Sequence, residues 1–195
     1  TSLDHLIYLK KPTVESRFFY SKIMHAFGNM MDYTYLDKLI NDCEIAKKSE
    51  PIKTYIYSSN ENLEKLFMLY GNELKQDSCA IYIIKEINGN SKETRSRFIQ
   101  YKNNEDVACP KLNPNASDVL YVGSSSTNVI NRLKQHILGT HTKTYALRLQ
   151  HWFQGQYEIE IRTYQVPPSI LQLIEDNLSH SLQPAFGKKE EIANS

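Results

Sequence analysis

The sequence predicts an α+β protein in which a mostly helical N-terminal region, residues 1–77, precedes alternating strands and helices over residues 78–189 and a tail, residues 190–195. Apolar residues recur at helical spacing in the first region, whereas short β-branched runs alternate with capped helical segments in the second. The chain has 195 residues, of which 41% are hydrophobic, and this is enough for one substantial core.

Helices dominate the N-terminal prediction. Residues 16–31 are rich in bulky apolar side chains, and Asp32 is placed to cap a second helix that follows. Residues 53–57 alternate as in a strand or an extended linker. Ser58 and Glu61 have the spacing of a capping box before a further helix. This region contains no catalytic constellation.

The second region predicts three strands and three helices. The strands are expected at residues 79–84, 118–123 and 157–162. The helices are expected at residues 128–139, 143–153 and 167–182. An insertion at about residues 87–117 separates the first two strands and holds a possible extra strand at 97–102. Long connections in compact domains are more often functional than idle.

Composition narrows the cellular setting and the partners. Cys43, Cys79 and Cys109 lie far apart without CxxC spacing, which argues against a disulfide framework or a structural zinc site. No apolar run is long enough to cross a bilayer and no export signal opens the sequence, so we expect a cytoplasmic protein without a membrane partner. The net charge is +1, but residues 78–189 carry 13 Lys and Arg against 9 Asp and Glu, a modest excess that matters if a polyanion binds there.

The second predicted strand leads through a small polar turn directly into a helix. Backbone N–H groups and the helix dipole make such a junction an anion site. On that helix, Arg132 and His136 lie one turn apart on the same side, at the edge of the buried stripe. They are either a solvated arginine with a histidine that caps a carbonyl, or a cation pair aimed at a phosphate. Arginine binds phosphate bidentately, and histidine exchanges protons near neutral pH.

Three further side chains are candidates for chemistry. Glu175 lies within the apolar stripe of the last helix, and a carboxylate there needs a partner. That partner is either Arg162 or a lysine, in a structural salt bridge, or a Mg²⁺ ion. Tyr82 and Tyr121 alternate with apolar strand neighbours, so antiparallel pairing of their strands places both phenols on one face. Taken singly, each is also explained as a half-buried sheet tyrosine.

These features, in this order, resemble the GIY-YIG nuclease domain. The resemblance covers residues 78–188, a little over half of the chain. It rests on the strand Ile81-Tyr82-Ile83, the strand Tyr121-Val122-Gly123-Ser124, Arg132 followed four residues later by His136, and Glu175 on a later helix. The first motif is degenerate, with Ala80 in place of the leading glycine, and the second has Val in place of Ile.

The resemblance implies a small sheet of three antiparallel strands flanked by helices, and a divalent-metal-dependent endonuclease that hydrolyses phosphodiester bonds in DNA, double-stranded DNA being favoured. By resemblance, Tyr82 is or helps to form the general base, and Tyr121 supports it. Arg132 stabilises charge on the scissile phosphate, His136 assists proton movement, and Glu175 holds Mg²⁺ or another divalent cation such as Mn²⁺. The expected nucleic-acid contacts are Gly123, Ser124, Ser125 and Lys134. A homodimer would bring two sites to the two strands of a duplex. By the same resemblance, residues 1–77 are a candidate DNA-recognition or dimerisation element.

The chain departs from the family pattern near its end. Many members carry an Asn in a Pro-x-x-Asn context after the metal-binding glutamate, whereas this sequence has Gly187 there, after Pro184. Two other classes of function stay open. One is a catalytically weak or inactive nucleic-acid-binding module that retains the fold. The other is a protein-interaction domain that uses the acidic, tyrosine-rich first region.

Overall fold

The structure is a computed structural model that describes residues 32–74 and 79–188. The predicted helix at 16–31 lies outside these residues. By internal contacts the chain divides into two units, residues 1–40 and 41–195. This division does not coincide with the predicted boundary near residue 77, and the second unit contains the whole sheet.

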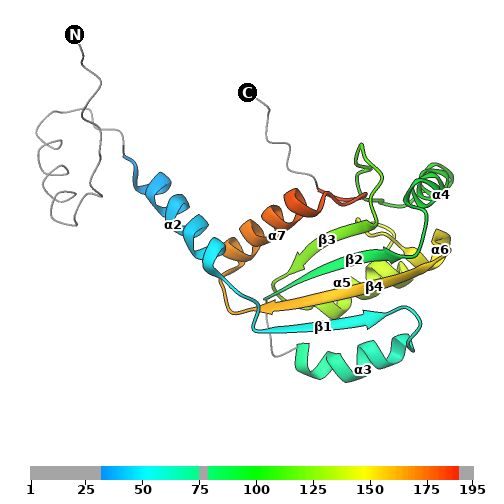
Figure 1. The fold of residues 1–195 in the computed structure, drawn as a ribbon, viewed down its shortest axis with the longest axis horizontal. Helices are drawn as coiled ribbons and strands as arrows, with labels where there is room; N and C mark the ends of the chain where they lie inside the picture. Colours follow the sequence, from blue (N-terminus) through cyan, green and yellow to red (C-terminus); the bar gives the residue numbers. More distant parts are fainter. Residues whose placement is uncertain (1–31, 75–78, 189–195) are drawn as a thin grey trace, which may run out of the picture. The chain divides into compact units, whose positions relative to one another are not determined.

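The second unit is built on a four-stranded antiparallel sheet (Figure 1). In chain order the strands are β1 (Lys53–Ser58), β2 (Cys79–Ile87), β3 (Val119–Ser125) and β4 (Gln156–Tyr164). In the sheet they follow the order β1-β4-β2-β3. The α+β class is therefore confirmed, and the prediction of three strands is wrong by one.

The additional strand is β1, which comes from the region predicted to precede the domain. It pairs with β4 in a register that places Thr54 opposite Arg162 and Tyr57 opposite Ile159. The alternation of residues 53–57 indicates an extended segment, but its partner is a strand far along the chain, and local patterning carries no information about that pairing. β1 and the helix after it therefore belong to the sheet domain.

Helices cover both faces of the sheet. Leu133 and Ile137 of α5 (Val129–Leu138) share a core with Ile84 of β2, together with residues of α3 (Leu63–Leu74), α4 (Ser91–Asn104) and α6 (Leu149–Trp152). On the opposite face, Ile174 of α7 (Pro168–Leu182) packs with Ile83. Both faces of β2 are buried, which explains its nearly continuous apolar sequence. Within the described part of the chain, no helix combines the length and apolar character needed to span a bilayer.

Some of the helix ends lie where the sequence predicts them, and one is capped by a different residue. Asn128 caps α5 through its side chain, and Gly139 ends it with a left-handed backbone conformation, as expected. The N-terminal helix α2 (Thr34–Lys48) follows Asp32, whose carboxylate accepts a hydrogen bond from the Thr34 N–H at 2.9 Å. The helix after β1 is α3, and its first turn is capped by the Asn62 side chain rather than by Ser58.

Two local predictions are wrong. The possible strand at 97–102 is part of α4, which the Asn90 side chain caps and which buries Thr94 and Phe98 one turn apart. The predicted helix at 143–153 is reduced to α6, because Arg148 takes a left-handed backbone conformation and ends a loop. Both segments contain apolar residues whose spacing does not separate the two states.

The segment after α7 closes the free side of β3. The backbone N–H groups of Ala185 and Phe186 donate to the carbonyls of Val119 and Leu120, at 2.8 and 3.0 Å. The Gly187 N–H donates to the Lys111 carbonyl of the insertion at 2.8 Å. The fully buried Phe186 ring lies 4.2 Å from that of Phe98. The end of the domain is therefore part of its core.

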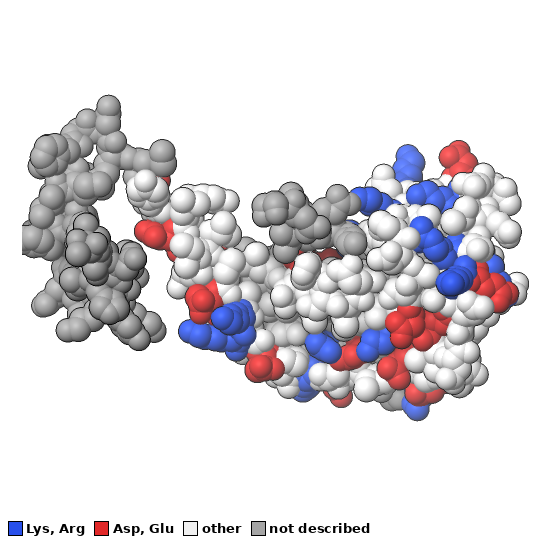
Figure 2. Space-filling model, turned by 45° about the horizontal axis from the view of Figure 1, so that its top comes forward, with Lys and Arg blue, Asp and Glu red and all other residues white. Residues whose placement is uncertain are grey.

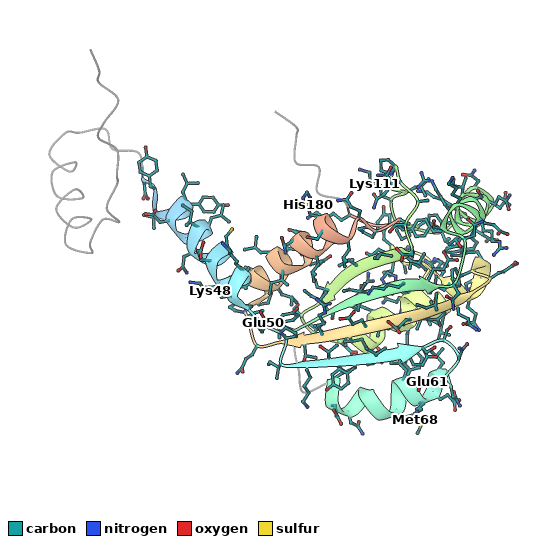
Figure 3. All side chains as sticks on the ribbon, viewed as in Figure 1. Lys48, Glu50, Glu61, Met68, Lys111 and His180 are labelled. Atoms are coloured by element: carbon teal, nitrogen blue, oxygen red, sulfur yellow. The ribbon has the colours of Figure 1, made fainter. Side chains whose placement is uncertain are left out.

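We expect Phe186→Ala to lower the free energy of unfolding by about 3–5 kcal/mol, because it leaves a cavity between α4, α6 and β3. Met68→Ala is the matched control, since Met68 is 74% exposed on α3 and points away from the sheet (Figure 3). Its effect should stay within about 0.5 kcal/mol. Urea denaturation measures both, and equal losses would contradict the role given to Phe186.

Candidate active site

Two tyrosines from neighbouring strands stack on one face of the sheet. Tyr82 of β2 lies opposite Gly123 of β3, and Ile84 lies opposite Tyr121, so both phenols project to the same side. Their ring centroids are 6.2 Å apart and the planes differ by 11°. Tyr82 is buried and Tyr121 half-buried. The predicted arrangement of the two phenols is confirmed.

Gly123 makes room for this pair. A Cβ atom at this position would lie 2.5 Å from Tyr82 Oη and 2.8 Å from Tyr121 Cε1. Real Cβ atoms do not approach other atoms so closely, so any side chain would displace the rings. The part played by Gly123 in the structure is to let the Tyr82 phenol pass over β3, which differs from the phosphate contact expected from the turn sequence.

His136 is fully buried beside both tyrosines. Its Nε2 atom lies 3.1 Å from Tyr82 Oη, and its ring centroid lies 4.4 Å from that of Tyr121. The backbone N–H of Leu147 donates to His136 Nδ1 at 3.3 Å. Because Nδ1 is an acceptor, the proton of the neutral ring is on Nε2, which donates to Tyr82 Oη. The imidazole thus fixes the Tyr82 oxygen and leaves the phenol proton available on the other side.

Burial and two guanidinium groups keep His136 neutral. Burial lowers its pKa to about 3, and the positive charges of Arg132 and Arg148 act in the same direction. The interpretation of His136 as a group that exchanges protons near neutral pH is corrected accordingly. In the structure it is a neutral hydrogen-bond donor that orients Tyr82.

Arg132 lies one turn before His136 on α5 and borders the same group. One guanidinium nitrogen, Nη2, lies 3.4 Å from His136 Nε2 and donates to the carbonyl of Tyr145 at 3.4 Å. The other, Nη1, donates to the side-chain oxygen of Gln135. Arg132 lowers the pKa of both tyrosines, but burial outweighs it, so the pKa of Tyr82 and that of Tyr121 lie above the ordinary value. Both phenols are therefore protonated at neutral pH.

Glu175 reaches the group from the other side of the sheet. It is carried by α7, and the Ser124 hydroxyl of β3 donates to its carboxylate. The charge of Glu175 raises the pKa of Tyr82 and of Tyr121, so the carboxylate acts electrostatically on both phenols. The alternative salt bridge with Arg162 does not form, because Arg162 Nε donates to Glu160 at 2.6 Å.

The Glu175 carboxylate suits a hard cation that needs few protein ligands. Burial raises its pKa, and the Ser124 hydrogen bond opposes that shift. Within residues 32–74 and 79–188, no cluster of three or more His, Cys, Asp or Glu is arranged to hold a metal. Mg²⁺ is commonly bound by one or two carboxylates with water and substrate phosphate completing its shell. One half-buried carboxylate that accepts a hydrogen bond from a serine hydroxyl fits that pattern and does not fit a closed protein cage.

The other expected nucleic-acid contacts have internal partners. Ser124 binds Glu175, and Ser125 Oγ accepts hydrogen bonds from the N–H groups of Thr127 and Asn128, at 3.4 and 3.1 Å. The turn before α5 thereby supplies its own acceptors at the helix start. Lys134 is not brought to the site, because its Nζ atom lies over the Phe67 ring of α3, 4.9 Å from the centroid.

Gly187, the departure from the family pattern, has a steric explanation. Its backbone has a φ of +104°, and a Cβ atom there would lie 2.7 Å from Tyr121 Cε2. A side chain at this position would both strain the backbone and push Tyr121 from its place. Gly123 and Gly187 are therefore two positions at which the backbone passes close to the tyrosine rings.

Sequence patterns missed the residues that fix this group from outside the strands. The Leu147 N–H and the Tyr145 carbonyl come from a loop predicted to be helical, and their contacts depend on the path of that loop. Arg148 organises the loop and gives no motif signal. Backbone N–H and carbonyl groups are the same in almost every residue, so no sequence pattern identifies which of them bind Arg132 and His136.

Comparison of the chain with protein-family models, with curated proteins and with solved structures found no match. The functional proposal therefore rests on the geometry of Tyr82, Tyr121, Arg132, His136 and Glu175 and on the motif resemblance.

We expect Gly123→Ala to destabilise the protein by about 1–3 kcal/mol, because the added methyl group displaces the Tyr82 ring and breaks its bond to His136. Gly71→Ala is the control. A Cβ atom meets nothing within 4 Å there, and the change should stabilise α3 by about 0.5–1 kcal/mol. In urea unfolding, the free energy of unfolding should fall for Gly123→Ala and rise for Gly71→Ala. Any other result would contradict the close approach at Gly123.

Acid should destabilise the protein through His136. Its pKa is about 3 when folded and near 6.5 when unfolded, so the unfolded state binds more protons as the pH falls from 6.5 towards 3. The expected loss is about 1–2 kcal/mol between pH 6.5 and 5. His136→Asn cannot be protonated and should flatten that slope, although its stability at pH 7 is lower.

His180→Asn is the control for this measurement, since His180 is exposed at the end of α7 (Figure 3). Urea unfolding at several pH values should give it the slope of the wild type. A His136→Asn slope equal to the wild-type slope would show that the buried imidazole does not govern acid stability.

Proposed function

We propose that the protein is a divalent-metal-dependent endonuclease of GIY-YIG type that hydrolyses phosphodiester bonds in DNA. The observation that carries the proposal is the convergence of the two stacked tyrosines, the neutral His136 and the Arg132 guanidinium on one face of the sheet. Glu175 adds a carboxylate whose charge reaches both phenols. These groups supply a proton acceptor, a phosphate-binding cation and a metal ligand.

Arg132 is the phosphate-binding group. Its guanidinium is half-buried and permanently charged, and it lies beside the phenols. Charge develops on the non-bridging oxygens of the phosphate in the transition state, and a fixed cation at that place stabilises it. Gln135 and the Tyr145 carbonyl orient the guanidinium before the substrate arrives.

Tyr82, once ionised by loss of its phenol proton to bulk water, is the proton acceptor for the attacking water. Its oxygen receives a hydrogen bond from His136 and interacts with Arg132, and both groups favour the phenolate. Burial opposes them and keeps the phenol protonated in the protein alone. Glu175 would hold the divalent cation, which would supply positive charge to the reaction when bound. Tyr121 stacks on Tyr82 and limits the positions that its ring can take.

The charge distribution supports a polyanionic substrate. Helix α4, within the insertion, has four basic residues and one acidic residue over Ser91–Asn104. Figure 2 shows Lys and Arg side chains gathered at the end of the molecule where α4 lies. Two of them brace the insertion, since Arg95 donates to the Asn113 carbonyl and Lys102 to that of Pro110. Cleavage of both strands of a duplex by this single site would take a homodimer or two successive visits.

Plasmid DNA incubated with the purified protein should be nicked or linearised in Mg²⁺ or Mn²⁺ and left intact in EDTA. Glu175→Gln, Arg132→Ala and Tyr82→Phe should each lower the rate by about 100-fold or more, since each removes a group that acts on the reacting phosphate or water. Glu64→Gln, which changes an exposed carboxylate on α3, is the control and should cut at the wild-type rate.

Three results would contradict the proposal in different ways. Undiminished cutting by Glu175→Gln removes Glu175 from the site. Salt-dependent DNA binding without cutting in either metal indicates a binding module that retains the fold. Absence of any DNA binding leaves the protein-interaction alternative.

A further inference from the structure

The loop between α5 and α6 is organised around a buried arginine. Arg148 is 2% exposed, and its guanidinium donates to the backbone carbonyls of four loop residues. These are Gly139, His141, Thr142 and Thr144. A loop backbone held in this way by one charged group has little freedom, so the points from which its side chains project are fixed.

Tyr145 lies in the part of this loop that contacts Arg132 and His136. Its own carbonyl accepts a hydrogen bond from Arg132, and the N–H two residues later, on Leu147, donates to His136. Ala146 and Leu147 are buried, whereas the Tyr145 side chain is 67% exposed. A single exposed apolar side chain is ordinary on a protein surface. Tyr145 differs because Arg132 of the candidate active site binds its carbonyl, and His136 binds the backbone two residues later.

We propose that Tyr145 is a stacking platform for an unpaired base of the nucleic-acid substrate, next to the phosphate held by Arg132. This inference rests on the proposed function and deepens it by naming a substrate class, DNA with an unpaired nucleotide beside the cleavage position. An aromatic ring stacks on a base only where the face of that base is free, as in single strands, tails and bulges.

The charge of the loop agrees with this substrate. Between Gly139 and Arg148 the sequence contains Lys143 and His141 but no Asp or Glu, so nothing in the loop repels a phosphate backbone. Lys143 is exposed two residues before Tyr145. Nucleic-acid channels without sequence preference combine these two components, a basic track for the backbone and aromatic rings for the bases.

Binding in EDTA separates this inference from catalysis. Fluorescence anisotropy of the full chain is measured with a labelled blunt duplex and with the same duplex extended by a single-stranded tail. Tyr145→Ala should weaken binding to the tailed duplex by about 10-fold or more and leave the blunt duplex within about two-fold. Tyr145→Phe keeps the ring and should bind both like the wild type.

Two further variants calibrate the measurement. Lys143→Ala should weaken both DNAs alike and reduce the salt dependence of binding, as loss of a phosphate contact does. Ile56→Ala replaces an apolar side chain on β1 that is 56% exposed and should change neither DNA. A circular dichroism spectrum matching that of the wild type confirms that Tyr145→Ala is folded.

The inference fails if Tyr145→Ala binds the tailed duplex like the wild type, or if it weakens both DNAs equally. It also fails if Tyr145→Phe is as weak as Tyr145→Ala. In any of these cases, cutting of plasmid by the wild type in Mg²⁺ would leave the nuclease proposal standing. A wild-type protein that neither binds nor cuts any of these DNAs overturns both.

Discussion

The hydrogen bond between His136 and Tyr82 is the interaction on which the rest of the site depends. It joins α5 to β2 inside the core, where neither group is hydrated. The Leu147 N–H occupies the second imidazole nitrogen, so the ring has one tautomer and one orientation. Because an unpartnered imidazole or phenol would be costly at this depth, the helix, the strand and the loop must be assembled together.

The loop that binds His136 also positions Arg132, which is only half-buried. The loop that supplies the Leu147 N–H is shaped by the buried Arg148 guanidinium, and the Tyr145 carbonyl in that loop holds Arg132. Structural and functional roles are therefore not separate here. The cation that keeps the loop in place also helps to hold His136 neutral, because its charge opposes protonation of the imidazole.

Much of this arrangement follows from the sequence. Strands β2, β3 and β4 are recognisable because burial on one or both faces leaves a local pattern, and α5 and α7 because apolar residues recur once per turn. That local reading also places Tyr82 and Tyr121 on one side of the sheet. It does not assign β1 to the sheet, since pairing with β4 is a property of two distant segments.

The candidate site, like the fold, has features that the sequence predicts and features that it does not. Arg132 and His136 share a helix face, which spacing alone predicts, whereas the titration behaviour of His136 depends on burial and on Arg148, which no spacing indicates. The sequence leaves a strand possible at 97–102, whereas this segment is helical in the structure, with Asn90 as the cap and Phe98 buried. Gly123 and Ser124 are explained by the tyrosine and the carboxylate that they contact, and these contacts exist only after the chain has folded.

The segment from Pro184 to Gly187 has a consequence for the order in which the protein becomes functional. It lies between β3 and the insertion, and Gly187 abuts the Tyr121 ring. Because synthesis runs from the N-terminus, these residues are made after every strand and helix of the domain. A nascent chain can thus form most of its sheet before the residue that abuts the Tyr121 ring has been made. For the nuclease proposed above, translation itself would delay activity until the domain is finished.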